Sequence, residues 1–268
     1  MPELGPLIGQ GQQAEIYAWD DGRVVKLFFE KFSQESVERE AMLTGAVAAT
    51  GLPVPQIFDT VQIDGRHGFV MSRVEGISLL DRFGSKPWGL LGDAKLFASL
   101  HAQVNATQSD DLPPLREHLR ASITEAGVLP DEWKAEAHTV LNALPDGDFV
   151  CHGDFHPDNV MITSDGPAII DWPAAHKGSP AADFARALVV LMTATLPAHI
   201  PRFQRLMMDA GRALFTHTYR KHYRRTTRMN PDYVRAWMLP ICAARFNENP
   251  VNDMPALHRL MAKLINEG

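Results

Sequence analysis

The strongest structural signal in this chain is the stretch Phe149-Val-Cys-His-Gly-Asp-Phe-His-Pro-Asp-Asn-Val-Met-Ile162, continued by Ile169-Ile-Asp-Trp172. Its polar residues lie between three short apolar runs, 149–151, 160–162 and 168–170. Such runs, bounded by Gly, Pro and Asp, are typical of buried strands joined by tight turns. Polar groups on a buried frame are costly to remove from water unless they are paired or bind a ligand. The stretch therefore indicates a functional site built on strands.

Three residues of this stretch have a spacing that is typical of phosphoryl transfer. Asn159 lies five positions after Asp154 (159 − 154), as in the catalytic loop of kinases, and Asp171 lies twelve positions after Asn159 (171 − 159). Phosphoryl transfer requires an acceptor hydroxyl aimed at the γ-phosphate and divalent cations that neutralise charge on the phosphate oxygens. Asp154 can orient the hydroxyl, while Asn159 and Asp171 offer the hard oxygen ligands that suit magnesium.

At these residues the chain resembles a known family. The motif His152-Gly-Asp-Phe-His-Pro-Asp-Asn159, followed by Ile-Ile-Asp171-Trp, is similar to the signature of the aminoglycoside phosphotransferase and choline kinase family. The segment 183–186, Asp-Phe-Ala-Arg, resembles that family's continuation. The resemblance implies that Asp154 is the catalytic aspartate and that Asn159 and Asp171 are the magnesium ligands.

The resemblance also implies an α+β fold with two lobes, similar to that of protein kinases. Residues 1–75 would form an N-terminal nucleotide-binding lobe, a small antiparallel sheet with one helix. Residues 76–268 would form a larger, mainly helical lobe for catalysis and acceptor binding. In the related fold, backbone groups between the lobes hold the adenine edge, so Ser72, Arg73 and Val74 are the candidates for binding the nucleotide base. The plain alternative is a strand that ends in a linker.

Two other interpretations of the motif remain open. The alternating His and Asp residues of 152–158 could form a metallohydrolase site, because alternate residues lie on one face of a strand. That interpretation explains neither Asn159 nor Asp171, and Pro157 would interrupt the strand. The second alternative is a turn cluster in which Asp and His side chains only bind loop backbone, and this is what we expect of His152.

Near the N-terminus, Lys26 lies inside an apolar run and is preceded by a turn that contains Gly9 and Gly11. A buried lysine is costly unless it is paired. The kinase arrangement supplies the α/β-phosphates of the nucleotide and a glutamate of the next helix as partners. We choose Glu40 because its surroundings resemble the family's helix glutamate. The alternatives are an exposed Lys26 on an edge strand and a glycine pair that marks an ordinary tight turn.

Helical patterns account for most of the remaining sequence. Polar caps and apolar residues near a helical period predict helices at 33–49, 92–104, 114–126, 131–143, 180–196, 199–223, 231–246 and 253–266. His101 is expected to be a core or interhelix hydrogen-bonding residue, without a catalytic role. Asp183 is expected to face back toward the catalytic loop and brace it.

Charge and cysteine content restrict the class of protein. The net charge of −6 argues against general nucleic-acid binding, and the apolar runs are too short for a membrane span. Two cysteines without a Cys-x-x-Cys pair, and a start that lacks the features of a signal peptide, predict a cytoplasmic protein. No nucleic-acid or membrane partner is expected, and the protein would be a monomer or a homodimer.

Several departures from the protein-kinase pattern favour a small-molecule kinase. Gly153 stands where protein kinases have an arginine, and Trp172-Pro173 replaces Phe-Gly after Asp171. Only eleven residues separate Asp171 from Asp183 (183 − 171 − 1), which leaves little room for an activation segment. We therefore expect ATP (or GTP) and Mg²⁺ as cofactors and a small-molecule hydroxyl as acceptor. A catalytically weak nucleotide-binding regulatory module remains an alternative.

A basic segment follows the predicted site. Residues 202–228 contain eight Arg and Lys residues and one acid, a net charge of +7 (8 − 1), so the rest of the chain carries −13 (−6 − 7). Such a run is ordinarily a solvated helix face. If part of it borders the acceptor site instead, its field would repel a polycation and favour a neutral or anionic acceptor.

Overall fold

The computed structural model describes residues 4–196, 200–248 and 250–267, which fold into two compact units. The first unit contains the chain up to Asp81 together with Asp158–Ala175, and the second contains Arg82–Pro157 and the chain from His176 onward. This division differs from the predicted boundary after residue 75. The chain thus passes between the units three times, and the residues of the sequence motif are divided between them.

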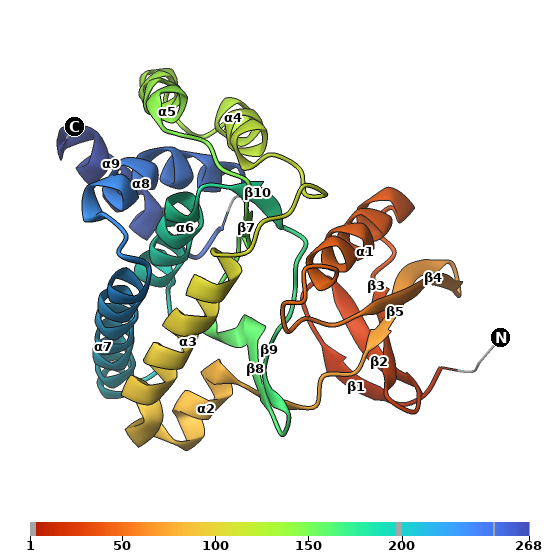
Figure 1. Ribbon diagram of the computed structural model, residues 1–268. Coiled ribbons are helices and arrows are strands. Elements are labelled where there is room, and N and C mark those ends of the chain that lie inside the picture. The colour runs from red at the N-terminus through yellow and green to blue at the C-terminus, as the bar shows by residue number, and fades with distance from the viewer. Residues whose placement is uncertain (1–3, 197–199, 249, 268) are drawn as a thin grey trace. The chain divides into compact units, whose positions relative to one another are not determined.

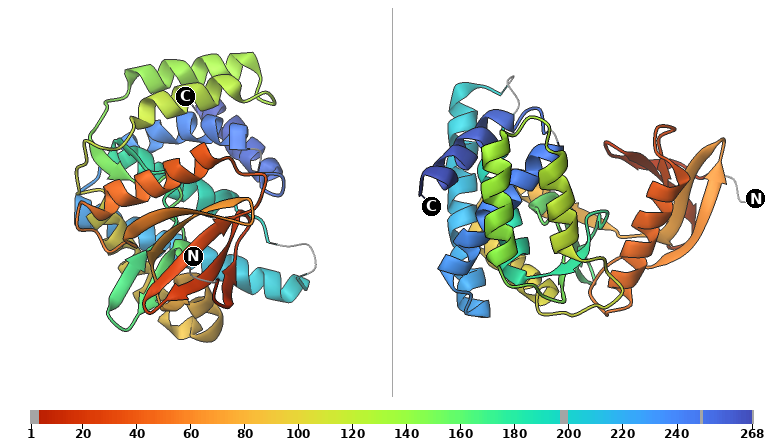
Figure 2. Two further views of the ribbon diagram at one scale, coloured as in Figure 1. Left: turned by 90° about the vertical axis from the view of Figure 1, so that its right-hand side faces the viewer. Right: turned by 90° about the horizontal axis from the view of Figure 1, so that it is seen from above.

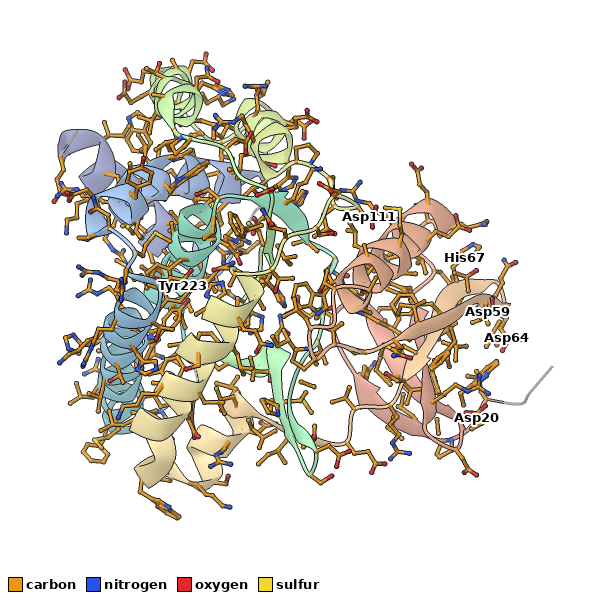
Figure 3. All side chains as sticks on the ribbon, in the orientation of Figure 1. Asp20, Asp59, Asp64, His67, Asp111 and Tyr223 are labelled. Carbon is orange, nitrogen blue, oxygen red and sulfur yellow. The ribbon has the colours of Figure 1, made fainter. Side chains whose placement is uncertain are left out.

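A five-stranded antiparallel sheet forms the body of the first unit (Figure 1). Alternating or continuous apolar residues, punctuated by Asp-Gly turns, produce its hairpins; Gly22 (φ 84°) and Gly65 (φ 79°) supply the left-handed backbone that these turns need. In spatial order the strands are β1 (Leu7–Gln10), β2 (Ala14–Asp20), β3 (Arg23–Phe28), β5 (Arg66–Ser72) and β4 (Ile57–Ile63). Asp20 ends β2, Asp59 lies in β4, and Asp64 lies in the turn between β4 and β5 (Figure 3).

One helix, α1 (Gln34–Ala48), packs against this sheet. Ser33, the first residue of the predicted range 33–49, is its N-cap and accepts a hydrogen bond from the backbone N–H of Ser36. The helix buries an apolar face that includes Val37 and Ala41 against Phe28 and Phe69 of the sheet. This cluster forms the apolar core of the unit.

A second sheet of three short strands completes the first unit. It consists of β6 (Gly76–Ser78), β8 (Val160–Thr163) and β9 (Gly166–Ile169), with β8 in the centre. The backbone of β6 approaches β8 so closely that a Cβ at Gly76 would lie 2.3 Å from the carbonyl oxygen of Ile162. Only glycine fits there. Because β6 pairs with β8, residues 76–81 belong to the first unit, beyond the predicted boundary.

The second unit is mainly helical (Figure 2). Its two-stranded sheet pairs β7 (Phe149–Cys151) with β10 (His176–Gly178). The helices are α2 (Leu79–Ser85, which begins in the first unit), α3 (Leu90–Val104), α4 (Leu115–Glu125), α5 (Asp131–Ala143), α6 (Pro180–Thr193), α7 (Arg202–Thr227), α8 (Pro231–Arg245) and α9 (Met254–Glu267). Within the described ranges, no helix is both long and apolar enough to span a membrane.

Buried aromatic rings join α3, α6 and α7 in the core of the second unit. Phe97 contacts Tyr219 (4.8 Å between ring centroids), and Phe184 stacks on Tyr223 (3.9 Å). All four residues are buried. Tyr223 points from α7 into the space between α3 and α6 (Figure 3). This aromatic layer supports the segment that follows β7.

The predicted elements agree with the structure, apart from a few ends and three short elements. Helix α7 continues to Thr227 instead of ending at 223. The predicted start of α7 at 199 lies outside the described residues. Elements α2, β6 and β10 were not expected, because two of them are three-residue strands that depend on distant pairing partners.

Candidate active site

In the first unit, Lys26 of β3 lies between two carboxylates. Its Nζ is 2.6 Å from Oε1 of Glu40 on α1 and 2.9 Å from Oδ1 of Asp171. The side chains of Lys26 and Glu40 are 14% and 5% exposed, whereas that of Asp171 is 40% exposed. The predicted pairing of Lys26 with Glu40 is confirmed. Of the three glutamates on α1, only Glu40 is on its buried face.

Electrostatics keep the lysine charged. Burial by itself would lower the pKa of Lys26, but the negative charges of Glu40 and Asp171 outweigh it and raise the pKa above its ordinary value. Lys26 is therefore a fixed positive charge beside a half-exposed carboxylate. Such a charge can bind phosphate oxygens.

The hairpin of β8 and β9 brings Asn159 and Asp171 to the same end of the second sheet. Asn159 directly precedes Val160, whose ladder partner is Ile169, and Asp171 follows two residues after Ile169. The carbonyl oxygen of Asn159 accepts a hydrogen bond from the N–H of Ile170 (2.9 Å), which continues the ladder to the edge of the site. The side chain of Asn159 is buried.

Asp171 has an unusual backbone conformation. Its φ of 66° is in the left-handed region, which costs energy for a residue with a Cβ. The next residue, Trp172, is fully buried and donates from Nε1 to the carbonyl oxygen of Ile169 (3.1 Å). This anchor holds the tight turn. Backbone strain of this kind concentrates at functional sites, where it orients a side chain.

The chemistry of Asn159 and Asp171 fits magnesium. In nucleotide sites Mg²⁺ is bound by one or two carboxylates together with substrate phosphates and water, without a complete protein cage. An amide and a carboxylate at one end of a hairpin meet that requirement. Among the residues that the structure describes, no three or more His, Cys, Asp or Glu side chains are grouped to hold a metal ion.

The glycine turn and the segment after β5 give the nucleotide prediction less support. Neither Gly9 nor Gly11 has a positive φ, and a Cβ at either would meet only ordinary contacts. The backbone N–H of Ser72 donates to Gln56, and that of Arg73 donates to Gly22. Because these two N–H groups are already bonded, binding of the nucleotide base by 72–74 would use backbone carbonyl oxygens or the N–H of Val74.

In the second unit, Asp183 of α6 holds the start of the catalytic loop. Its Oδ2 accepts the backbone N–H of His152 and its Oδ1 accepts that of Gly153, both at 2.9 Å. Gly153 has a φ of 77°, which turns the chain sharply before Asp154. The expectation that Asp183 braces the loop is confirmed.

A buried network supports this carboxylate. His101 and Asn105, at the end of α3, each contact Oδ2 of Asp183 at 2.9 Å. Nδ1 of His101 lies 2.5 Å from the hydroxyl of Tyr219 on α7, and Oδ1 of Asn105 accepts a hydrogen bond from the hydroxyl of Tyr223 on the same helix (2.7 Å). Burial by itself would raise the pKa of Asp183, but His101, the N–H of Gly153 and Asn105 lower it well below its ordinary value. His101 is thus the interhelix hydrogen-bonding residue that the sequence predicts.

Asp154 lies beside positively charged or protonatable groups of the same unit. His156 Nε2 is 3.3 Å from its Oδ2. Burial favours a higher pKa, but the hydrogen bond with His156 and the positive field of His156, Arg186 and His152 lower the pKa of Asp154 well below its ordinary value. The carboxylate therefore stays ionised. At neutral pH it can accept a hydrogen bond from a hydroxyl and orient it, but it is a weak proton acceptor.

Arg186, for which the sequence indicated no role, lies next to the catalytic loop. Its Nε donates to the carbonyl oxygen of Gly153 (2.8 Å), and its Nη1 and Nη2 bind both carboxylate oxygens of Glu248 (2.6 and 2.8 Å). The only signal for Arg186 was its place in the 183–186 segment. No local signal indicates Glu248, because it is 62 residues away.

The metallohydrolase interpretation required a strand through 152–158, and this strand does not form. The chain leaves β7 at Cys151, turns at Gly153 and enters a short 3-10 helix, Pro157–Asn159. Alternate side chains therefore do not share a strand face. The structure assigns Asp154 to the second unit, and Lys26, Glu40, Asn159 and Asp171 to the first.

Solved structures that match this fold include aminoglycoside phosphotransferases. A thermostable mutant of aminoglycoside phosphotransferase APH(4)-Ia, in complex with ADP and hygromycin B, matches with a TM-score of 0.68 and 15% identity, over 99% of this chain and 94% of that one. Aminoglycoside-3'-phosphotransferase of type VIII matches with a TM-score of 0.61 and 18% identity, over 89% and 92%. A streptomycin–ATP complex of APH(2'')-IIa matches with a TM-score of 0.57 and 16% identity, over 98% and 91%.

These matches and the two units define the class: the chain has the two-lobed, protein-kinase-like α+β fold of small-molecule phosphotransferases, which confirms the predicted fold class. No curated protein matches the sequence significantly. The model of the phosphotransferase enzyme family matches residues 6–223. The chain belongs to this family, and the resemblance stated from the sequence motif is confirmed.

Proposed function

We propose that this enzyme transfers the γ-phosphate of ATP, in the presence of Mg²⁺, to a hydroxyl group of a small molecule. The observation that carries the proposal is the position of Lys26 between Glu40 and Asp171, at 2.6 and 2.9 Å, in a chain of the phosphotransferase enzyme family. A lysine paired with a helix glutamate is the arrangement that kinases use to hold the α/β-phosphates.

The first unit would bind the nucleotide and the metal. Lys26 would bind phosphate oxygens, with Glu40 fixing its position, and Asn159 and Asp171 would be the Mg²⁺ ligands. The turn with Gly9 and Gly11 and the backbone of 72–74 would contact the phosphates and the base, respectively. Bound Mg²⁺ would neutralise charge on the β- and γ-phosphate oxygens. Similar structures contain ADP or ATP, which supports ATP as the donor, and GTP is the alternative.

Asp154 would orient the acceptor hydroxyl. Its lowered pKa suits a hydrogen-bond acceptor that remains ionised, because phosphoryl transfer through a loose transition state needs positioning more than early proton removal. The backbone before it is held by Asp183, and Arg186 binds the carbonyl oxygen of Gly153. These contacts limit the directions in which the carboxylate of Asp154 can point.

The acceptor would be a small molecule that carries a hydroxyl group. Similar structures contain hygromycin B or streptomycin, and the short segment between Asp171 and Asp183 lacks room for the activation loop of a protein kinase. If part of the basic segment 202–228, with its net charge of +7, borders the acceptor site, its field would favour an acceptor that is less cationic than an aminoglycoside. The protein would act in the cytoplasm, as a monomer or a homodimer, without nucleic-acid or membrane partners.

The decisive experiment screens hydroxyl-bearing metabolites and antibiotics for transfer of labelled γ-phosphate, with and without Mg²⁺. We expect Mg²⁺-dependent transfer from ATP to at least one acceptor, and its loss in Asp154→Ala. Calorimetric titration with ATP and Mg²⁺ runs in parallel. Tight nucleotide binding without transfer to any acceptor would instead support the regulatory-module alternative.

A further inference from the structure

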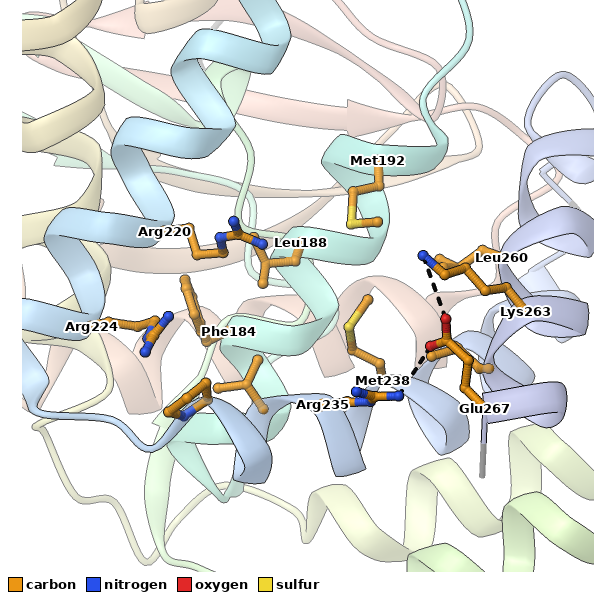
Figure 4. Close-up of a pocket in the computed structure, with 13 residues that line it drawn as sticks. Phe184, Leu188, Met192, Arg220, Arg224, Arg235, Met238, Leu260, Lys263 and Glu267 are labelled. Atoms are coloured by element: carbon orange, nitrogen blue, oxygen red, sulfur yellow. Dashed lines mark hydrogen bonds and ion pairs between the residues drawn. The ribbon is translucent and has the colours of Figure 1, made fainter.

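A cavity of about 260 Å³ lies in the second unit, among α6, α7, α8 and α9 (Figure 4). None of the proposed nucleotide, metal or catalytic residues lines it. Its apolar wall comes from Leu188 and Met192 of α6, Met238 of α8 and Leu260 of α9, together with the ring of Phe184. This wall suits a hydrocarbon group.

Four cationic side chains surround the apolar wall. Arg220 and Arg224 project from α7, Arg235 from α8 and Lys263 from α9. The one acid in the lining is Glu267, so these five residues carry a net charge of +3 (4 − 1). Part of the basic segment that the sequence indicated therefore faces a cavity, not only solvent.

The four cations are not equally neutralised. Glu267 binds both Arg235 (3.1 Å) and Lys263 (3.8 Å), as the dashed lines in Figure 4 show. Within the described part of the chain, neither Arg220 nor Arg224 forms an ion pair, and the buried Nε of Arg224 has no hydrogen-bond partner. A buried donor without a partner is costly. An anionic group at this side of the cavity would supply the missing acceptor.

We propose that this cavity is a binding site for a medium-chain carboxylate, with its alkyl chain against the apolar wall and its head group on Arg220 and Arg224. A bidentate arginine–carboxylate contact is stronger than a neutral hydrogen bond. The volume corresponds to roughly eight or nine water-sized groups, at about 30 Å³ each. A chain of about eight carbons is therefore the appropriate length. Polycations are disfavoured by the +3 lining.

Helix α6 lines the cavity and also holds the catalytic loop, so that a ligand in the cavity can affect the loop through this helix. Phe184 lines the cavity, while its neighbour Asp183 holds the N–H groups of His152 and Gly153. Binding is nevertheless tested independently of catalysis. Binding of a carboxylate in this cavity is a separate property from the proposed phosphotransfer and does not require it.

The test compares three probes of equal chain length, octanoate, octanol and octylamine, by calorimetric titration of the full-length protein. We expect octanoate to bind saturably and octanol and octylamine to bind at least about tenfold more weakly, because only the carboxylate matches the arginines. This comparison needs no substitution. Absence of saturable octanoate binding, or equal affinity for octanol, would overturn the proposal.

Substitutions then locate the site. Arg220→Met combined with Arg224→Met should weaken octanoate binding at least about tenfold, since it removes both unpaired cations while keeping apolar volume. The matched control is Arg225→Met, an exposed arginine of the same helix outside the cavity, which should leave the affinity unchanged. Met238→Trp should abolish binding by filling the cavity. An equal loss in Arg225→Met, or unchanged binding in Met238→Trp, would place the anion elsewhere and refute the proposal.

Discussion

Asp183 is the residue whose removal should perturb the second unit most severely. Its carboxylate accepts two backbone N–H groups of the catalytic loop and contacts His101 and Asn105, all at 2.9 Å, and its side chain is 1% exposed. Asp183→Asn keeps the shape but replaces one acceptor oxygen with an NH₂ group. That group then faces donors, and the charge that balances the network is lost.

The cost follows from this geometry. Removing one partner from a buried, hydrogen-bonded charged pair costs about 3–5 kcal/mol. Total stability of a domain is about 5–15 kcal/mol, so the variant loses a large part of it. For a unit of this size the loss corresponds to a Tm lower by roughly 6–20 °C.

Urea unfolding and calorimetry measure this loss. The matched control is Asp131→Asn, a fully exposed acid on α5, which should leave the Tm almost unchanged. If Asp183→Asn melts within about 2 °C of wild type, the network does not stabilise the unit and the reasoning is wrong. Phosphate transfer should fall as well, because the backbone before Asp154 loses two of its anchors.

The pH dependence has a definite sign. The pKa of Asp183 is lowered in the folded state, so its stabilising contribution is complete above the pKa of an unfolded Asp, about 3.9. The stability difference between wild type and Asp183→Asn should therefore be constant from about pH 8 to 5 and shrink as the pH falls below about 4. A difference that shrinks instead between pH 7 and 5 would contradict the assignment.

Three further predictions concern the proposed reaction. Asp154→Ala should reduce transfer by about 10²–10⁴-fold, with nucleotide affinity and Tm almost unchanged; more than about a tenth of wild-type transfer would exclude it as the orienting residue. Asp171→Ala should weaken calorimetric binding of ATP with Mg²⁺ as well as the rate, because it removes a charged metal ligand; unchanged affinity would exclude Asp171 from the metal site. Aminoglycosides such as kanamycin and gentamicin should be poor acceptors, and kcat/KM of about 10⁴ M⁻¹s⁻¹ or more would show that the basic helix does not bias the acceptor site.

Local sequence signals specify most of the secondary structure. The Asp-Gly turns, the Ser33 cap and the apolar periodicities are local signals, and each coincides with a hairpin or helix in the structure. The spacing of Asp154, Asn159 and Asp171 indicated phosphoryl transfer, and the motif around these residues resembled the family signature. The Lys26–Glu40 pair was predictable too, because a buried lysine needs a partner and the next helix offered few candidates.

Contacts between residues that are distant in the sequence depend on tertiary packing. The contacts of Arg186 with Glu248 and of Asp183 with His101 join residues 62 and 82 positions apart, and no local periodicity encodes them. The surroundings of the basic segment 202–228 likewise cannot be predicted from local sequence. Its charge is evident in the sequence, but whether Arg224 faces water or a cavity depends on how α7 packs against α6, α8 and α9. Periodicity specifies which residues share a face, while packing alone determines what that face contacts.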